Sequence, residues 1–243
     1  MVKAGDPIAA LNRQAFLMKK ILVVLACCLP MCTMAQRFME EGNMTLTDIN
    51  GKPVFLKSEY HFDGSPFFKD EFCIARLKVI NGKTYENLPV KLNLQDNRII
   101  YRQPDGVEME AVSRIEFLEF VGCANGEVPL FRSGYPPVDD QNAGTYYQVL
   151  ESGPVQLLKL WRVSYIDQKP YGSASTVRKF ERSPVYYAYT QAKGMIPLGK
   201  GNELALLLDQ ERVAKVNAYA RQENLRLRKE EDLRKLIAFY NTQ

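Results

Sequence analysis

The sequence is poor in histidine, the residue on which much metal and acid–base chemistry depends. Its single histidine is His61. One histidine excludes the two-histidine helix motif of metalloproteases and argues against three-histidine zinc sites. A serine–histidine–aspartate triad would need His61, and no Gly-x-Ser-x-Gly elbow accompanies it. We therefore expect no metal and no cofactor, and we place His61 in an aromatic-rich loop beside Phe62, Phe67 and Phe68.

Phosphate-binding motifs and a strong charge of one sign are also missing. The segment 199–201 lacks the glycine spacing and the strand-to-helix context of a phosphate loop. The formal net charge is +4, and residues 1–35 carry +3 of it through Lys3, Arg13, Lys19 and Lys20, opposed by Asp6. The remainder is nearly neutral and offers no electrostatic footprint for a polyanion. The sequence therefore predicts no nucleic-acid partner.

No apolar run approaches the roughly 20 residues that a helix needs to span a bilayer. The apolar run 21–31 has the length of a secretory signal core, Lys19 and Lys20 precede it, and Thr33 and Ala35 are small residues before a cleavage point. We predict a signal peptide over 18–35, cleavage between Ala35 and Gln36, and an upstream extension over 1–17. The mature chain is expected to be exported, to the periplasm, the outer-envelope surface or the medium, with no transmembrane helix.

Lipid anchoring at Cys27 is a competing interpretation of the same segment. Residues 24–27 loosely match a lipidation box. A lipid-modified cysteine leads into a polar tether, whereas 28–31 stays apolar. We therefore favour ordinary cleavage over lipidation of Cys27.

Cysteine is scarce once the predicted signal peptide is removed. Cys73 and Cys123 remain, an even pair in an oxidising compartment, and a disulfide between them is possible. The alternative is two buried thiols that act as small apolar residues. The sequence leaves both open.

Short strands and turns dominate residues 44–198. Asn81-Gly82 predicts a type I′ hairpin turn, and Pro104-Asp105-Gly106 predicts another turn. Two polar loops are expected, over 122–145 and 167–177. The predicted strands are 44–49, 53–56, 72–80, 83–94, 98–102, 107–112, 115–121, 146–151, 155–166, 185–190 and 195–198. We predict a mainly β domain over 36–198, an antiparallel meander that forms a sandwich or barrel-like sheet.

Two or three short helices are predicted over 199–243, packed on the same domain. A leucine-rich turn at 204–208 is followed by a helix that Asp209 would cap. The last helix, 229–240, places Leu233, Leu236, Ile237 and Tyr240 on one face. Binding of that face to a membrane or a partner is the alternative to packing on the sheet.

Candidate functional side chains are few. Asp139 and Asp140, with Asn142 nearby, could offer oxygens to calcium or act as a carboxylate pair, although a solvated loop is the simpler interpretation. Tyr146, Tyr147, Tyr186, Tyr187 and Tyr189 could form a stacking platform for sugars, although we favour core and cross-strand packing, because tyrosine is a preferred strand residue.

Several segments resemble a group of exported, β-rich bacterial proteins of unknown function. The segments that carry the resemblance are 64–68 (GSPFF), 79–85 (VINGKTY), 146–150 (YYQVL), the leucine-rich helix and 236–241 (LIAFYN). The resemblance spans most of residues 43–243, and it implies export and one domain but no activity and no site residue.

These observations predict an exported, non-enzymatic protein of the cell envelope that acts as a binding or interaction module. The partner expected is an envelope protein or a glycan. The alternative is a carboxylate-dependent hydrolase that acts on a glycan or another extracellular polymer, with its carboxylates in or near 122–145.

Overall fold

The computed structural model describes residues 52–53, 60–123, 128–169, 171, 175–199, 206 and 210–243. All of them belong to one compact unit, Leu46–Gln243. The predicted signal peptide, with Cys27 and the cleavage point at Ala35 and Gln36, lies outside the described residues, as do the predicted strand 44–49 and the helix cap Asp209.

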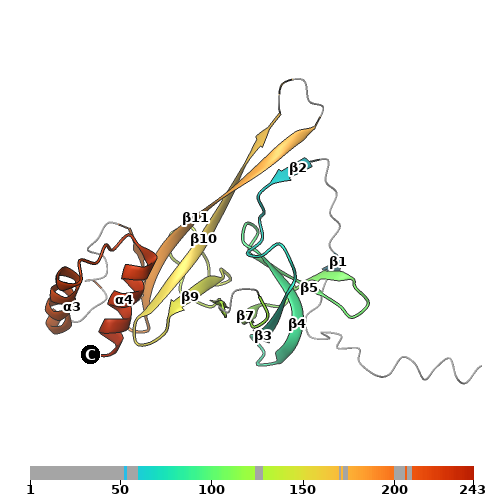
Figure 1. The fold of residues 1–243 in the computed structure, drawn as a ribbon. Helices are drawn as coiled ribbons and strands as arrows, with labels where there is room; N and C mark the ends of the chain where they lie inside the picture. Colours follow the sequence, from blue (N-terminus) through green and yellow to red (C-terminus); the bar gives the residue numbers. More distant parts are fainter. Residues whose placement is uncertain are drawn as a thin grey trace, which may run out of the picture. The chain divides into compact units, whose positions relative to one another are not determined.

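The described residues form a mixed and mainly antiparallel sheet with two C-terminal helices (Figure 1). The order along the sheet is β1-β6-β5-β4-β3-β7-β8-β9-β10-β11-β12, and β2 pairs in parallel with β11. The strands are β1 (Lys52–Pro53), β2 (Tyr60–Asp63), β3 (Cys73–Val79), β4 (Thr84–Asn93), β5 (Arg98–Arg102), β6 (Glu108–Glu110), β7 (Ile115–Phe120), β8 (Leu130–Arg132), β9 (Tyr147–Glu151), β10 (Gln156–Gln168), β11 (Thr176–Thr190) and β12 (Gly194–Leu198). The predicted mainly β fold with C-terminal helices is confirmed, and the sheet is not closed into a barrel.

Strands β3 to β8 enclose the first core. Every second residue of β3 is buried, beginning with Cys73, which is the alternation expected of a strand with one face on the core. The hairpin predicted at Asn81-Gly82 forms, but the type I′ turn was wrong. Positive φ falls on Gly82 (90°) and not on Asn81, and the Gly82 N–H donates to the Val79 carbonyl. Gly106, at φ 87°, closes the β5–β6 hairpin in the same way through the Gln103 carbonyl.

Cys73 and Cys123 are joined by a disulfide, with their Cα atoms 5.2 Å apart. Cys73 opens β3, and Cys123 follows β7, which pairs antiparallel with β3. The two interpretations that the sequence left open are thus resolved in this structure, because antiparallel pairing brings the two residues within bridging distance.

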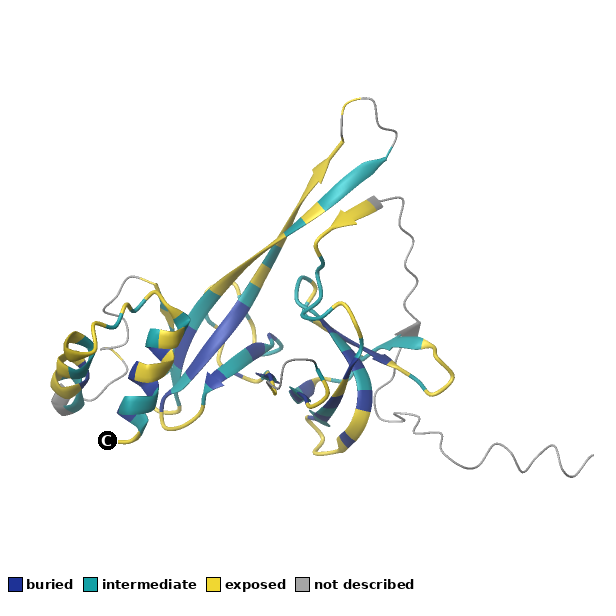
Figure 2. Cartoon of the chain, viewed as in Figure 1, coloured by how far each residue is buried: buried dark blue, intermediate teal, exposed yellow. Residues whose placement is uncertain are grey.

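The long hairpin β10–β11 is paired without interruption from Gln156 with Tyr189 to Gln168 with Val177 (Figure 1). Its distal half exposes residues of both faces, as the yellow segments of Figure 2 show. The predicted loop 167–177 and strand 185–190 were therefore wrong at their boundaries, because β11 begins at Thr176. The predicted loop 122–145 likewise contains β8, which bridges β7 and β9.

The helices α3 (Gln210–Gln222) and α4 (Glu230–Asn241) complete the second core. Leu233, Leu236, Ile237 and Tyr240 of α4 are buried, as their spacing predicted. The Asn241 side chain secures the end of α4 by accepting from the Val155 N–H (3.0 Å) and donating to the Val155 carbonyl (2.8 Å). Among the helices of the described residues, none has the length and apolar character needed to cross a membrane.

Candidate functional site

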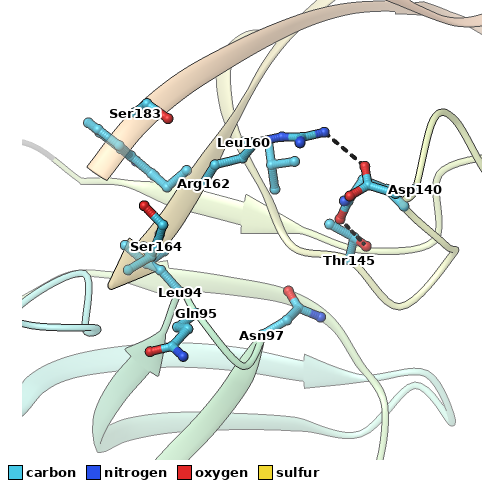
Figure 3. Close-up of a pocket in the computed structure, with 12 residues that line it drawn as sticks. Leu94, Gln95, Asn97, Asp140, Thr145, Leu160, Arg162, Ser164 and Ser183 are labelled. Atoms are coloured by element: carbon cyan, nitrogen blue, oxygen red, sulfur yellow. Dashed lines mark hydrogen bonds and ion pairs between the residues drawn. The ribbon is translucent and has the colours of Figure 1, made fainter. Parts of the chain in front are cut away.

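A cavity of about 440 Å³ lies beside the middle of β10 (Figure 3). Three parts of the chain line it: the consecutive β10 residues 160–164, the β4–β5 turn at 94–97, and the segment 140–145. Ser183 of β11 completes the lining. The cavity falls within the 300–1,000 Å³ range that is usual for small-molecule and cofactor sites.

The Asn97 side chain fixes one wall of this cavity. Asn97 has a φ of 55°, a left-handed conformation that asparagine tolerates better than most residues. Its amide Nδ2 donates to the Gly144 carbonyl (2.8 Å), and its Oδ1 accepts from the Tyr146 N–H (2.9 Å). The β4–β5 turn and the segment that precedes β9 are therefore joined by two hydrogen bonds from one side chain.

The charged groups of the cavity are Asp140 and Arg162, and they pair with each other. An Arg162 nitrogen lies 2.8 Å from Asp140 Oδ1, as the dashed line in Figure 3 shows. Hydrogen bonds from Gln141, from backbone and from Arg162 hold the pKa of the exposed Asp140 carboxyl below its usual value. A hydrogen bond with Tyr187 raises the pKa of Arg162, with the nearby carboxylate of Asp140 adding to the effect. Both groups are thus charged, and they largely neutralise one another.

Asp139 and Asn142, the other predicted candidates, are engaged by the protein itself. The Tyr187 hydroxyl donates to Asp139 Oδ2 (3.1 Å), and the Gly144 N–H donates to Asn142 Oδ1 (2.7 Å). Within the described parts of the chain, no group of three His, Cys, Asp or Glu residues could hold a metal ion. His61 lies exposed in β2 rather than in a loop.

A cluster of tyrosines packs in one core with Leu160, a residue that lines the cavity. The rings of Tyr135, Tyr147 and Tyr187 meet edge to face, with Tyr147 5.6 Å from Tyr135 and 5.5 Å from Tyr187. Tyr147 and Tyr187 are 1% and 0% exposed, so their faces are in the core and offer no stacking platform. Burial raises the pKa of Tyr135 to about 12 and also raises that of Tyr147.

Three polar side chains of the lining remain available to a ligand. Within the described part of the chain, no hydrogen bond from another residue reaches the Gln95 amide, the Ser164 hydroxyl or the Ser183 hydroxyl. Sequence reasoning missed all three, together with Asn97 and Arg162. These five residues come from the β4–β5 turn, β10 and β11. The turn is far from the two strands in the sequence, and no local sequence pattern indicates that they are neighbours in the fold.

A second cavity, of about 450 Å³, also borders the β4–β5 turn and shares Gln95 with the first. Its lining is more apolar and includes Phe62, Phe67 and Phe180. The Phe62 and Phe180 rings are 6.0 Å apart, and Arg182 holds the neighbouring wall by donating to the Ser65 carbonyl (2.9 Å). Gln95 therefore stands between a polar cavity and an aromatic one.

Comparisons with protein-family models, with curated proteins and with solved structures found no match for this chain.

Proposed function

We propose that this chain is an exported, non-enzymatic binding module of the cell envelope, and that the cavity beside β10 is its ligand site. One observation carries the proposal. The cavity presents uncommitted hydrogen-bonding groups from Gln95, Ser164 and Ser183 against a wall that Asn97 fixes, while its charged pair is already neutralised. Such a lining suits a neutral, polar ligand, which includes the backbone of a polypeptide. It offers directed hydrogen bonds and contains no reactive group.

The chemistry of Asp140 favours binding over hydrolysis. A glycosidase needs one carboxylic acid whose pKa is raised, so that it can protonate the leaving group. The pKa of Asp140 is shifted in the opposite direction, and Asp140 is the one carboxylate among the described lining residues. The alternative function, a carboxylate-dependent hydrolase acting on a glycan, draws its support from the position of Asp140 in the cavity and of Asp139 beside it.

Export is supported by the signal-like segment 18–35 and by the Cys73–Cys123 disulfide, since structural disulfides persist in oxidising compartments. We propose the periplasm, the outer-envelope surface or the medium as the location. Mass analysis of the mature protein from its own cells should find Gln36 at the amino terminus. Palmitate incorporation that is lost in Cys27→Ser would instead establish lipid anchoring.

Photo-cross-linking tests the binding site directly. Ser164→p-benzoylphenylalanine places a photoreactive group in the cavity, and the same change at the exposed Ser152, in the β9–β10 turn, is the control. Irradiation of intact cells should give a discrete adduct from position 164 that position 152 does not give. Identical adducts from both positions, or none from 164, would reject the site.

Hydrolysis assays on envelope polysaccharides separate the two functions. The binding module should release no product. Release that is abolished in both Asp139→Asn and Asp140→Asn, with folding intact by circular dichroism, would establish the hydrolase instead.

A further inference from the structure

The edge of β10 that faces the cavity is left without a partner strand. Strand β9 pairs with β10 at Leu157 to Lys159 and then turns away. From residue 160 to 168, no described strand lies on this side of β10, although β11 continues along the other side. Residues 160–164 of this open edge are the consecutive residues that line the cavity.

Two prolines show which backbone groups point outward. In an antiparallel ladder, opposed residues either exchange two hydrogen bonds with each other or direct their N–H and C=O groups away from each other. Pro184 lies opposite Trp161 and has no N–H to exchange, so this pair is of the second kind. The backbone N–H and C=O of Trp161 therefore point away from β11, toward the cavity.

Pro197 of β12 gives the same result independently. It lies opposite Tyr187, so the backbone of Tyr187 is directed to β10 rather than to β12. Tyr187 and Leu158 are then a hydrogen-bonded pair, and so are Val185 and Leu160 two residues on. The backbone N–H and C=O groups of Trp161 therefore face the open edge. Those of Val163 do so too, because the direction repeats every second residue.

The open edge, residues 160–168 of β10, lacks the proline that commonly protects an edge strand, and its central charge is paired. Edge strands are commonly blunted by proline or by inward-pointing charge. Strand β12, at one end of the sheet, contains Pro197, whereas β10 contains no proline from Gln156 to Gln168. Arg162, the charge at the centre of the edge, is held by Asp140. The backbone groups of Trp161 and Val163 make no hydrogen bond to any other described residue.

We infer that the cavity receives an extended polypeptide segment of a partner protein, which adds to the sheet as a strand beside β10. This inference rests on the proposed binding function and names the class of ligand. The incoming backbone continues the ladder where β9 leaves it and bonds Trp161 and Val163, as in other cases of strand addition. Gln95, Ser164 and Ser183 then contact the side chains of the segment, and alternate residues face opposite sides of the sheet.

Substitution at Val163 tests the backbone contribution. Val163→Pro removes an N–H that the ladder to β11 does not use, so the hairpin should stay folded. Val163→Ala shortens the side chain and keeps the N–H, and it is the matched control. We expect peptides selected on the wild-type protein from a random-sequence phage library to bind Val163→Pro at least about tenfold more weakly and to bind Val163→Ala nearly unchanged. Equal binding to all three proteins would overturn the inference.

Backbone methylation of the selected peptide gives a second test that does not depend on a protein variant. N-methyl groups placed along the peptide one at a time should abolish binding at every second residue and be tolerated at the residues between, because only alternate N–H groups face β10. Tolerance at all positions, or loss without this alternation, would contradict strand addition. A library that yields no peptide specific for the cavity contradicts it equally.

Failure of this inference can be separated from failure of the binding function. A discrete cross-link from position 164 to a glycan or a small molecule, together with no enriched peptide, retains the site and rejects its polypeptide ligand. Absence of any adduct specific to position 164 rejects both.

Discussion

Asn97 shows how much of the candidate site depends on single side chains. It combines a left-handed backbone with two hydrogen bonds that span 47 and 49 residues of sequence. The sequence predicted only the break between the strands 83–94 and 98–102 at this point, and asparagine favours such turns through its short polar side chain. What the turn contacts was not predictable, since the partner carbonyl of Gly144 is remote in the chain. The sequence therefore predicts the turns that border the site, but it does not predict that they come together to form a cavity.

We predict that Asn97→Ala lowers the free energy of unfolding by about 3 kcal/mol, of which about 2 kcal/mol reflects the two lost hydrogen bonds and the rest the positive φ. Asn224→Ala is the matched control, because Asn224 also has positive φ (51°) but is exposed, and its side chain makes no hydrogen bond to another described residue. Urea unfolding measures both. Equal losses in the two variants would show that the Asn97 bonds contribute nothing.

Two substitutions in the tyrosine cluster should change the free energy of unfolding in opposite directions. The buried Tyr147 hydroxyl has no partner among the described residues, whereas the Tyr187 hydroxyl donates to Asp139. Removing an unpaired buried hydroxyl relieves a desolvation cost, so Tyr147→Phe should raise the free energy of unfolding by about 1 kcal/mol. Tyr187→Phe should lower it by about 1 kcal/mol. Thermal unfolding of both variants in one buffer checks the sign, and a loss of stability in Tyr147→Phe contradicts the assignment.

At the scale of elements, apolar periodicity identified most strands and the last helix. It worked for β3, β4 and α4, where one face is buried and the pattern repeats with the period of the element. It failed for the first half of β11, where residues 181–184 are charged or small and exposed on both faces and Phe180 is the one large apolar side chain between 178 and 184. That segment is a strand because β10 and β2 supply its backbone partners, and no side-chain pattern records this.

Helix α4 should be the element whose core contacts matter most to the second half of the sheet. Ile237 is 0% exposed and lies in the cluster with Leu157 of β10. We expect Ile237→Ala to cost about 3 kcal/mol through lost burial and the cavity it leaves. Lys235→Ala, exposed on the same helix, should change stability by less than about 0.5 kcal/mol. Similar values for both, from urea unfolding, would show that α4 is not packed on the sheet as described.

At the scale of the whole molecule, the Cys73–Cys123 disulfide stabilises the fold, and a structural disulfide persists in an oxidising compartment such as the location that we propose. It closes a segment of 50 residues that contains β3 to β7. Loop closure of that length stabilises the folded state by about 4 kcal/mol. We predict that reduction, or the double change Cys73→Ala and Cys123→Ala, lowers the unfolding midpoint in urea accordingly. Unchanged unfolding under reducing conditions would remove the support that the disulfide gives to an oxidising compartment.

The central claim is that the cavity beside β10 is where this protein binds its ligand. Hydrogen–deuterium exchange on the intact chain, alone and with a solubilised envelope fraction of the cells that make it, measures this most directly. We predict that exchange slows at Trp161 and Val163 and in the segment 140–145, and stays the same in α4. Unchanged exchange at Trp161 and Val163, or protection confined to parts of the chain away from the cavity, would contradict the claim.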